Sequence, residues 1–117
     1  MQGRKNLVEG TEFLQVSSLK IADGESFQAH RHIWKALKVA QTIAQESWVV
    51  IAGKIEVTFF DLDDSLISKH ELSPGDCSIT LQGGHSYTAI GESLVYEFKS
   101  GPYEGQANDK VMIAEVR

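Results

Sequence analysis

The stretch SWVVIAGKIEVTFF (47–60) decides the fold class of this 117-residue chain. Its first half is a continuous apolar run, which is typical of a strand buried on both faces. In its second half Ile55, Val57 and Phe59 alternate with polar residues, and this period of two is that of a β-strand. The Asp-rich sequence DLDDS (61–65) follows directly and predicts a hairpin turn. Two consecutive strand signals that end in a turn indicate β-structure.

Similar short strand signals extend from this stretch toward both ends of the chain. The predicted strands are 13–21, 27–34, 47–53, 54–60, 65–72, 77–81, 85–90, 93–99 and 111–116. The segment 33–45 has apolar residues at spacings that fit a helix or a strand, and missing helix caps favour a strand. A turn signal about every ten residues predicts an all-β sandwich or barrel. Since no linker or repeat interrupts the pattern, we expect a single domain over residues 1–117.

Composition and charge narrow the class of function. The net charge of -5 argues against a nucleic-acid partner, because phosphate binding requires a basic face. No apolar run approaches the ~20 residues of a membrane span, and the first ten residues do not resemble a signal peptide. The single cysteine, Cys77, excludes an internal disulfide and alternates with apolar residues, so we expect a buried, inert thiol. These features predict a cytoplasmic protein that binds small molecules and neither nucleic acid nor membrane.

The sequence QAHRHIW (28–34) places two histidines one residue apart. On a strand, His30 and His32 share one face about 7 Å apart and are able to converge on one metal, whereas on a helix they would diverge. Two histidines hold a metal loosely, so further ligands are needed. His85 follows a glycine turn and is a candidate, whereas His70 is flanked by charged residues and is predicted to lie on the surface.

Glycines and a glutamate stand at defined spacings around the histidine pair. Gly24 is followed by five residues and then by His30-x-His32, and Glu46 is followed by six residues and then by Gly53. In these spacings the chain resembles the cupin superfamily of small antiparallel β-barrels, whose first motif reads G-x5-H-x-H-x3-4-E-x6-G. Thirteen residues separate His32 from Glu46 where the family has three or four. Glu46 therefore matches the motif only through its spacing to Gly53.

A later segment is similar to the second cupin motif, G-x5-P-x-G-x2-H-x3-N. Gly75 and Gly83 match the spacing of the motif glycines, and His85 lies one place earlier than the motif histidine. Leu81 replaces the proline, and Ala89 stands where the asparagine falls when counted from His85. The second motif is therefore degraded, while its histidine is retained.

The resemblance implies a jelly-roll barrel, an antiparallel double-stranded β-helix, with its core at about 13–99 and a C-terminal loop and strand at 100–117. It also implies that one divalent transition metal is bound inside the barrel by His30, His32, Glu46 and His85. Three histidines and a carboxylate suit iron, manganese, nickel, cobalt or zinc. In the alternative interpretation the histidines are merely half-buried and bonded to neighbours, and Glu46 is a solvated carboxylate, with Gln41 or Gln45 lining the pocket instead.

Other residues are candidates to line this site or to act in it. Parity along the strand places Gln28 and Trp34 on the face of the histidine pair, and Tyr87 on the face of His85, so these three are predicted pocket residues. In the alternative interpretation Trp34 and Tyr87 are ordinary core residues. Tyr87 is also a catalytic candidate.

Glu97 and Lys99 complete the catalytic candidates. They share one face of the last core strand and form either an exposed pair or acid–base groups at the barrel mouth. The favoured hypothesis is a metal-dependent enzyme, an oxygenase, isomerase or lyase, acting on a small polar molecule, for which a carbohydrate-derived compound is one option. The alternatives are a metal-free sugar-nucleotide isomerase or epimerase with a histidine base, and a non-catalytic sugar-binding or small-ligand module. Edge strands at 13–21 and 111–116 predict a homodimer.

Overall fold

The computed structural model describes residues 3–36, 41–101 and 110–113. Within these ranges every regular element is a strand, and the strands form one eight-stranded sheet and a separate two-stranded hairpin. The strands are β1 (Arg4–Asn6), β2 (Leu14–Ile21), β3 (Ser26–His32), β4 (Trp34–Ala36), β5 (Gln41–Ile43), β6 (Glu46–Phe60), β7 (Leu66–Leu72), β8 (Cys77–Thr80), β9 (Gly84–Ser100) and β10 (Lys110–Met112). The all-β prediction is confirmed. The described ranges contain no helix with the length and apolar character needed to cross a membrane.

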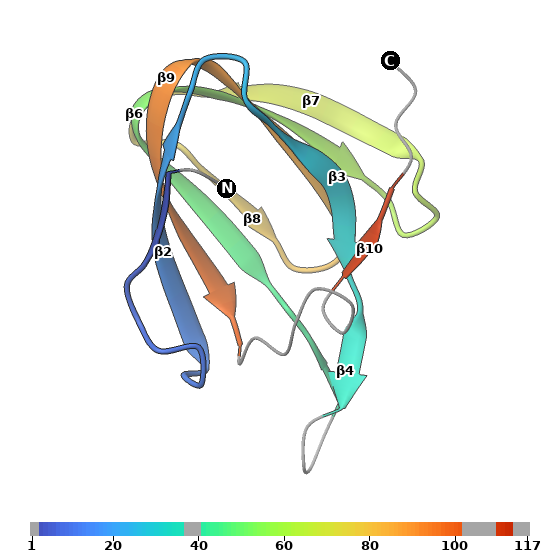
Figure 1. Ribbon diagram of the computed structural model, residues 1–117. Coiled ribbons are helices and arrows are strands. Elements are labelled where there is room, and N and C mark those ends of the chain that lie inside the picture. The colour runs from blue at the N-terminus through green and yellow to red at the C-terminus, as the bar shows by residue number, and fades with distance from the viewer. Residues whose placement is uncertain (1–2, 37–40, 102–109, 114–117) are drawn as a thin grey trace.

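Two long strands, β6 and β9, organise the fold. They pair antiparallel along their whole length, from Glu46 opposite Lys99 to Phe60 opposite Gly84. Each half of this ribbon pairs with different outer strands, so the curled sheet has two layers, here called faces of the barrel. The strand order is β1-β2-β9-β6-β8 in one face and β10-β3-β9-β6-β7 in the other. The sheet curls so that the two faces enclose an interior (Figure 1). This arrangement is the double-stranded β-helix that the sequence predicts.

The ribbon bends where the two faces meet. Gly53 has a φ of 83°, and the pairing of β6 with β9 shifts register on both sides of Ala52. A Cβ atom at Gly53 would lie 2.5 Å from the Glu92 carbonyl oxygen, so only glycine fits this close crossing in this conformation. The predicted strands 47–53 and 54–60 are therefore one strand, because the glycine bends the chain and does not reverse it.

The apolar core lies between the two faces. Its buried members come from three strands, β2, β6 and β9, and are Leu19, Ile21, Trp48, Val50, Ile55, Val57, Tyr87, Ala89 and Val95. Trp48 and Tyr87 stack across the interior with ring centroids 3.8 Å apart and planes only 3° apart. The predicted alternation of Ile55, Val57 and Phe59 points two of the three residues fully into this core, and Phe59 is half-buried.

Three predictions about individual segments need correction. Cys77 is exposed, because β8 turns Ser78 and Thr80 toward the interior and the cysteine outward. The segment 85–90 and the segment 93–99 belong to one strand, β9, which bends at its middle. The strand predicted at 13–21 is not an edge, because a short N-terminal strand that the sequence did not signal, β1, pairs with it.

The ambiguous segment 33–45 is a hairpin as far as it is described. The strands β4 and β5 pair antiparallel, with Trp34 opposite Ile43, which agrees with the strand interpretation. Residues 37–40 lie outside the described ranges, as do residues 114–116 of the predicted last strand. At the other end of that last strand, β10 pairs with β3 and adds an edge to the face that carries the histidine pair.

Candidate metal centre

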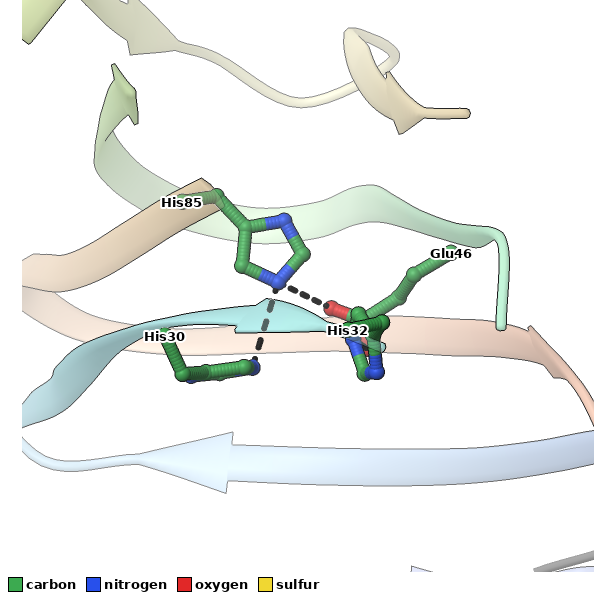
Figure 2. A group of neighbouring side chains, drawn as sticks. All are labelled: His30, His32, Glu46 and His85. Carbon is green, nitrogen blue, oxygen red and sulfur yellow. Dashed lines mark hydrogen bonds and ion pairs between the residues drawn. The ribbon is translucent and has the colours of Figure 1, made fainter. Parts of the chain in front are cut away.

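The structure brings together four ligand-type side chains that are far apart in the sequence. His30 and His32 lie on β3, Glu46 begins β6 and His85 is near the start of β9. All four are buried, and one ligand atom from each lies within 4.8 Å of the others. Figure 2 shows the three imidazoles and the carboxylate pointing toward one another.

Three of the separations between these atoms match those between neighbouring ligands of a bound metal ion. Oε1 of Glu46 is 3.3 Å from Nε2 of His32, and Oε2 is 3.1 Å from Nε2 of His85. The Nε2 atoms of His85 and His30 are 3.3 Å apart. Metal–ligand bonds of about 2.1 Å in tetrahedral or octahedral geometry place neighbouring donors about 3.0 to 3.4 Å apart. The donor set and its spacing therefore fit one divalent transition metal.

Bonds on the far side of two rings orient them for this purpose. Nδ1 of His30 lies 2.8 Å from the carbonyl oxygen of Gln28, and because a carbonyl only accepts, this nitrogen carries the proton. Nε2 of His30 then presents a lone pair to the cluster. Nδ1 of His85 lies 2.8 Å from the Oγ1 of Thr80, which holds its Nε2 toward the same point. Such outer partners are typical of metal-binding histidines.

The electrostatics favour the protonation states that a metal requires. Burial, together with the nearby His85 and Lys110, lowers the pKa of His30 to about 4, so the ring is neutral at pH 7. Burial by itself raises the pKa of Glu46, but His85 and His32 outweigh it and hold the pKa of this carboxyl well below its usual range. A neutral imidazole and an ionised carboxylate are the metal-ligating forms of these groups.

The predicted pocket residues on β3 and β4 do not join this cluster. A register shift between Phe27 and His30 breaks the parity on which that prediction depended, and Gln28 is exposed. Trp34 lies in the separate β4–β5 hairpin and is 56% exposed. Of the two neutral alternatives to Glu46, Gln45 is exposed, and the side chain of Gln41 lies outside the described part of the structure.

Tyr87 is buried beside the cluster, as its shared face with His85 predicts. Its hydroxyl lies 2.8 Å from the Oγ of Ser78 and 3.5 Å from Nδ1 of His85. Burial, reinforced by the nearby Glu46, raises the pKa of Tyr87 above its usual range. The phenol therefore stays protonated at neutral pH and acts as a packed, hydrogen-bonded wall.

Glu97 and Lys99 both border a polar cavity of about 300 Å³. Glu97 is buried and its carboxylate accepts hydrogen bonds from Arg4, at 2.7 and 3.2 Å, and from Nε1 of Trp48, at 3.1 Å. Lys99 is half-buried and lies directly opposite Glu46 in the β6–β9 pairing. Neither residue belongs to the exposed edge that the alternative interpretation proposed.

The sequence did not single out Ser78, Thr80 and Arg4, which complete the surroundings of the site. In CSITL (77–81) the apolar residues suggested the inward face, yet Ile79 is 63% exposed and the small hydroxyl residues point inward. The sequence showed that residues 77–81 alternate between apolar and small polar side chains. It did not show which set points inward, because that depends on the contacts of Ser78 with Tyr87 and of Thr80 with His85. His70 is exposed on β7, as predicted.

Solved structures with this architecture are numerous, although no protein-family model and no curated protein sequence matches the chain. KdgF from a Halomonas species is 24% identical over 86% of this chain and 78% of its own, with a TM-score of 0.66. A cupin superfamily protein from Desulfitobacterium hafniense is 18% identical over 83% of this chain and 74% of its own, with a TM-score of 0.62. The chain therefore has the cupin fold, and the resemblance inferred from its motifs is confirmed at the level of the fold.

One larger protein contains a similar barrel. CapF of Staphylococcus aureus, described as a capsular polysaccharide assembling protein, is 16% identical over 96% of this chain, with a TM-score of 0.76. The matched part is 32% of the CapF chain. A further CapF structure contains the inhibitor 3-isopropenyl-tropolone. At these identities the comparison establishes the shared fold only.

Proposed function

We propose that this protein is a metal-dependent cupin enzyme that binds one divalent transition metal and acts on a small polar molecule of carbohydrate type. The observation that carries the proposal is the convergence of His30, His32, Glu46 and His85 inside the barrel at metal-ligand spacing. The Nε2 atoms of His30 and His85 lie 3.3 Å apart, a spacing that fits either a hydrogen bond from the Nε2–H tautomer of His85 or two lone pairs directed at one cation. A bound cation would use both lone pairs together with the ionised carboxylate of Glu46.

When bound, the metal supplies Lewis-acid chemistry, which polarises oxygen atoms of a ligand. The chain contributes the surroundings. Thr80 and the Gln28 carbonyl orient two rings, and the stacked Trp48 and Tyr87 close the apolar side of the site against water. The polar cavity that includes Glu97 and Lys99 has a volume of about 300 Å³, which is enough for a small molecule.

Metal analysis tests the proposal. Protein purified without added metal should contain about one iron, manganese, nickel, cobalt or zinc ion per chain, and the His30→Ala/His32→Ala double variant should contain none. His70→Ala, which removes an exposed histidine from β7, is the matched control and should retain the metal. If the wild-type protein contains no stoichiometric metal, and added iron, manganese or zinc leaves its Tm unchanged, the proposal is wrong.

The metal-free isomerase or epimerase alternative is less well supported. A general base works best with a pKa near the working pH, whereas the pKa of His30 is lowered to about 4. The buried Glu46 beside two histidines also has no role in that scheme. A binding module without turnover is distinguished by assaying product formation for any ligand that raises the Tm of the metal-loaded protein.

A homodimer and a cytoplasmic location stay predictions. Among the described strands, β7 and β8 are paired on one side only and expose large apolar side chains, namely Leu66, Ile67 and Ile79. These edges replace the strand at 13–21 as the surface to test. Light scattering that reports a monomer would refute the dimer.

A further inference from the structure

The polar cavity next to the candidate metal centre has a specific chemical lining. It has a volume of about 300 Å³, which is at the small end of the range for ligand pockets. Its wall includes three cationic side chains and one carboxylate, together with uncharged polar groups and small residues. The lining residues that carry charge are Arg4, Lys99, Lys110 and Glu97.

The charge of this lining is opposite in sign to that of the whole chain. Three cations and one carboxylate give the cavity a formal charge of +2, whereas the chain carries -5. A concave site with low-dielectric walls concentrates the field of its charges and attracts ions of the opposite sign. The cavity therefore favours an anion over a neutral molecule of the same shape.

The register of the sheet places two of these cations beside the metal candidates. Lys99 lies directly opposite Glu46 on paired strands, and Lys110 lies directly opposite His32. Residues that face each other across an antiparallel pair project to the same side, with Cα atoms about 4.5–5.5 Å apart. Since Glu46 and His32 project into the barrel, both lysines project to the interior side as well.

Arg4 is held at the cavity by a buried partner. Its two terminal nitrogens donate to the two oxygens of Glu97, and Trp48 donates a third hydrogen bond to that carboxylate from the core side. Glu97 thereby orients Arg4 and tolerates burial because its own charge is compensated.

Neutral hydrogen-bonding groups complete the wall. Oδ1 of Asn6 accepts a hydrogen bond from the Ser17 hydroxyl at 2.8 Å, so the remaining groups of this amide are donors. Nε2 of Gln15 donates to the carbonyl oxygens of Glu9 and Glu12, which ties down the loop on the outer side of the cavity. Cations and amide donors together are suited to an oxygen-rich anion.

We infer that the ligand of this barrel is a small carboxylate-bearing polar molecule, whose carboxylate is bound in the cavity by Lys99, Lys110 and Arg4. The inference rests on the proposed function, because it names the substrate class of the same site. The polar remainder of the molecule then faces Glu46 and His32, across the strands from the two lysines. A size of about 300 Å³ restricts the ligand to a single sugar-acid unit or a molecule of similar size.

Binding to chelator-treated protein tests the inference separately from the metal. Isothermal titration compares two matched pairs of probes, glucuronate with glucose and gluconate with glucitol, in which the carboxylate is the main difference. At least one acid should bind saturably, about tenfold or more tightly than its neutral partner, and added salt should weaken it. Lys99→Met and Lys110→Met should each weaken that acid about tenfold, whereas Lys5→Met, on the exposed side of β1, should not.

Several results would overturn the inference. They are no saturable binding of either acid, equal binding of an acid and its neutral partner, and full binding to both cavity lysine variants after circular dichroism shows that they fold. Tighter binding of glucose 6-phosphate than of both acids would overturn the assignment to a carboxylate. Failure of the metal analysis together with retained acid binding would contradict the proposed function alone, and the reverse pattern would contradict this inference alone.

Discussion

The interior of this barrel has two parts that differ in composition although the same strands build them. On β6, Glu46 belongs to the candidate metal centre and Trp48, two residues later, belongs to the apolar core. On β9, His85 belongs to the candidate metal centre and Tyr87, two residues later, belongs to the apolar core. A strand returns to one face every second residue, so both parts lie on one continuous inward surface. The backbone does not distinguish them, and the side chains alone assign one part to packing and the other to chemistry.

The apolar core and the candidate metal centre also affect the stability of the fold in opposite ways. Burial of apolar side chains in the core stabilises the fold by removing hydrophobic area from water. Burial of three imidazoles and a carboxylate opposes folding unless the groups bond to one another or to a metal. We therefore expect substitutions in the core to change unfolding, and substitutions in the centre to change metal binding.

The largest expected effect on stability comes from the core. Leu19 is fully buried, and Leu19→Ala should lower the free energy of unfolding by about 3 to 4 kcal/mol through lost burial and a residual cavity. Chemical denaturation measures the loss, and metal content below the Tm should be unchanged. Leu66→Ala, at a position 61% exposed, is the control and should change stability by less than about 0.5 kcal/mol. Equal losses in both variants would contradict the assignment of the core.

The second effect is the pH dependence of chelator-treated protein. His30 has a pKa of about 4 in the fold and about 6.5 when unfolded, so the unfolded chain binds the additional proton between these values. Stability contributed by the neutral ring is complete above pH 6.5 and is lost as the pH falls toward 4, by up to roughly 3 kcal/mol. Urea denaturation across this range measures the decline, and His30→Gln should show a shallower one. A wild-type stability that rises on acidification would contradict the buried neutral imidazole.

A smaller effect is expected at the hydroxyl that orients His85. Thr80→Val removes the 2.8 Å contact with Nδ1 while keeping the shape of the side chain, and should weaken metal binding about 10- to 100-fold. Competition with a coloured chelator measures the affinity. Thr58→Val alters another buried threonine, outside the four-residue centre, and should leave the metal affinity unchanged. Identical affinities for Thr80→Val and wild type would show that Thr80 does not support the centre.

The smallest effect is expected on the outer side of the same strand, β8. Cys77 is exposed, so Cys77→Ser should change the free energy of unfolding by less than about 0.5 kcal/mol. The wild-type thiol should react completely with a thiol reagent in the native protein, without denaturant. A thiol that reacts only after unfolding would restore the buried position that the sequence predicted.

The strand pattern and the spacing of a few residues were enough to predict much of the fold and of the candidate site. Alternation in 54–60 and the turn signals predicted an all-β sandwich or barrel, because both depend only on neighbouring residues. The resemblance to the cupin motifs, through Gly24 to His30, Glu46 to Gly53 and His85 after its glycine turn, implied the four side chains that the structure brings together. Of the four, only the pairing of His30 with His32 follows from local geometry, because a strand places residues i and i+2 on one face.

Other features depended on contacts between distant segments. A bulge between Phe27 and His30 exposes Gln28, and pairing with a short N-terminal strand brings Arg4 to Glu97 across 93 residues of sequence. The inward face of β8 was also undetermined, because Cys77 and Ile79 are as apolar as any core residue. The sequence by itself determined the fold class and the candidate ligands. Only the tertiary structure decided which polar groups surround them, because strand pairing over long sequence separations sets register, and register sets which side chains meet.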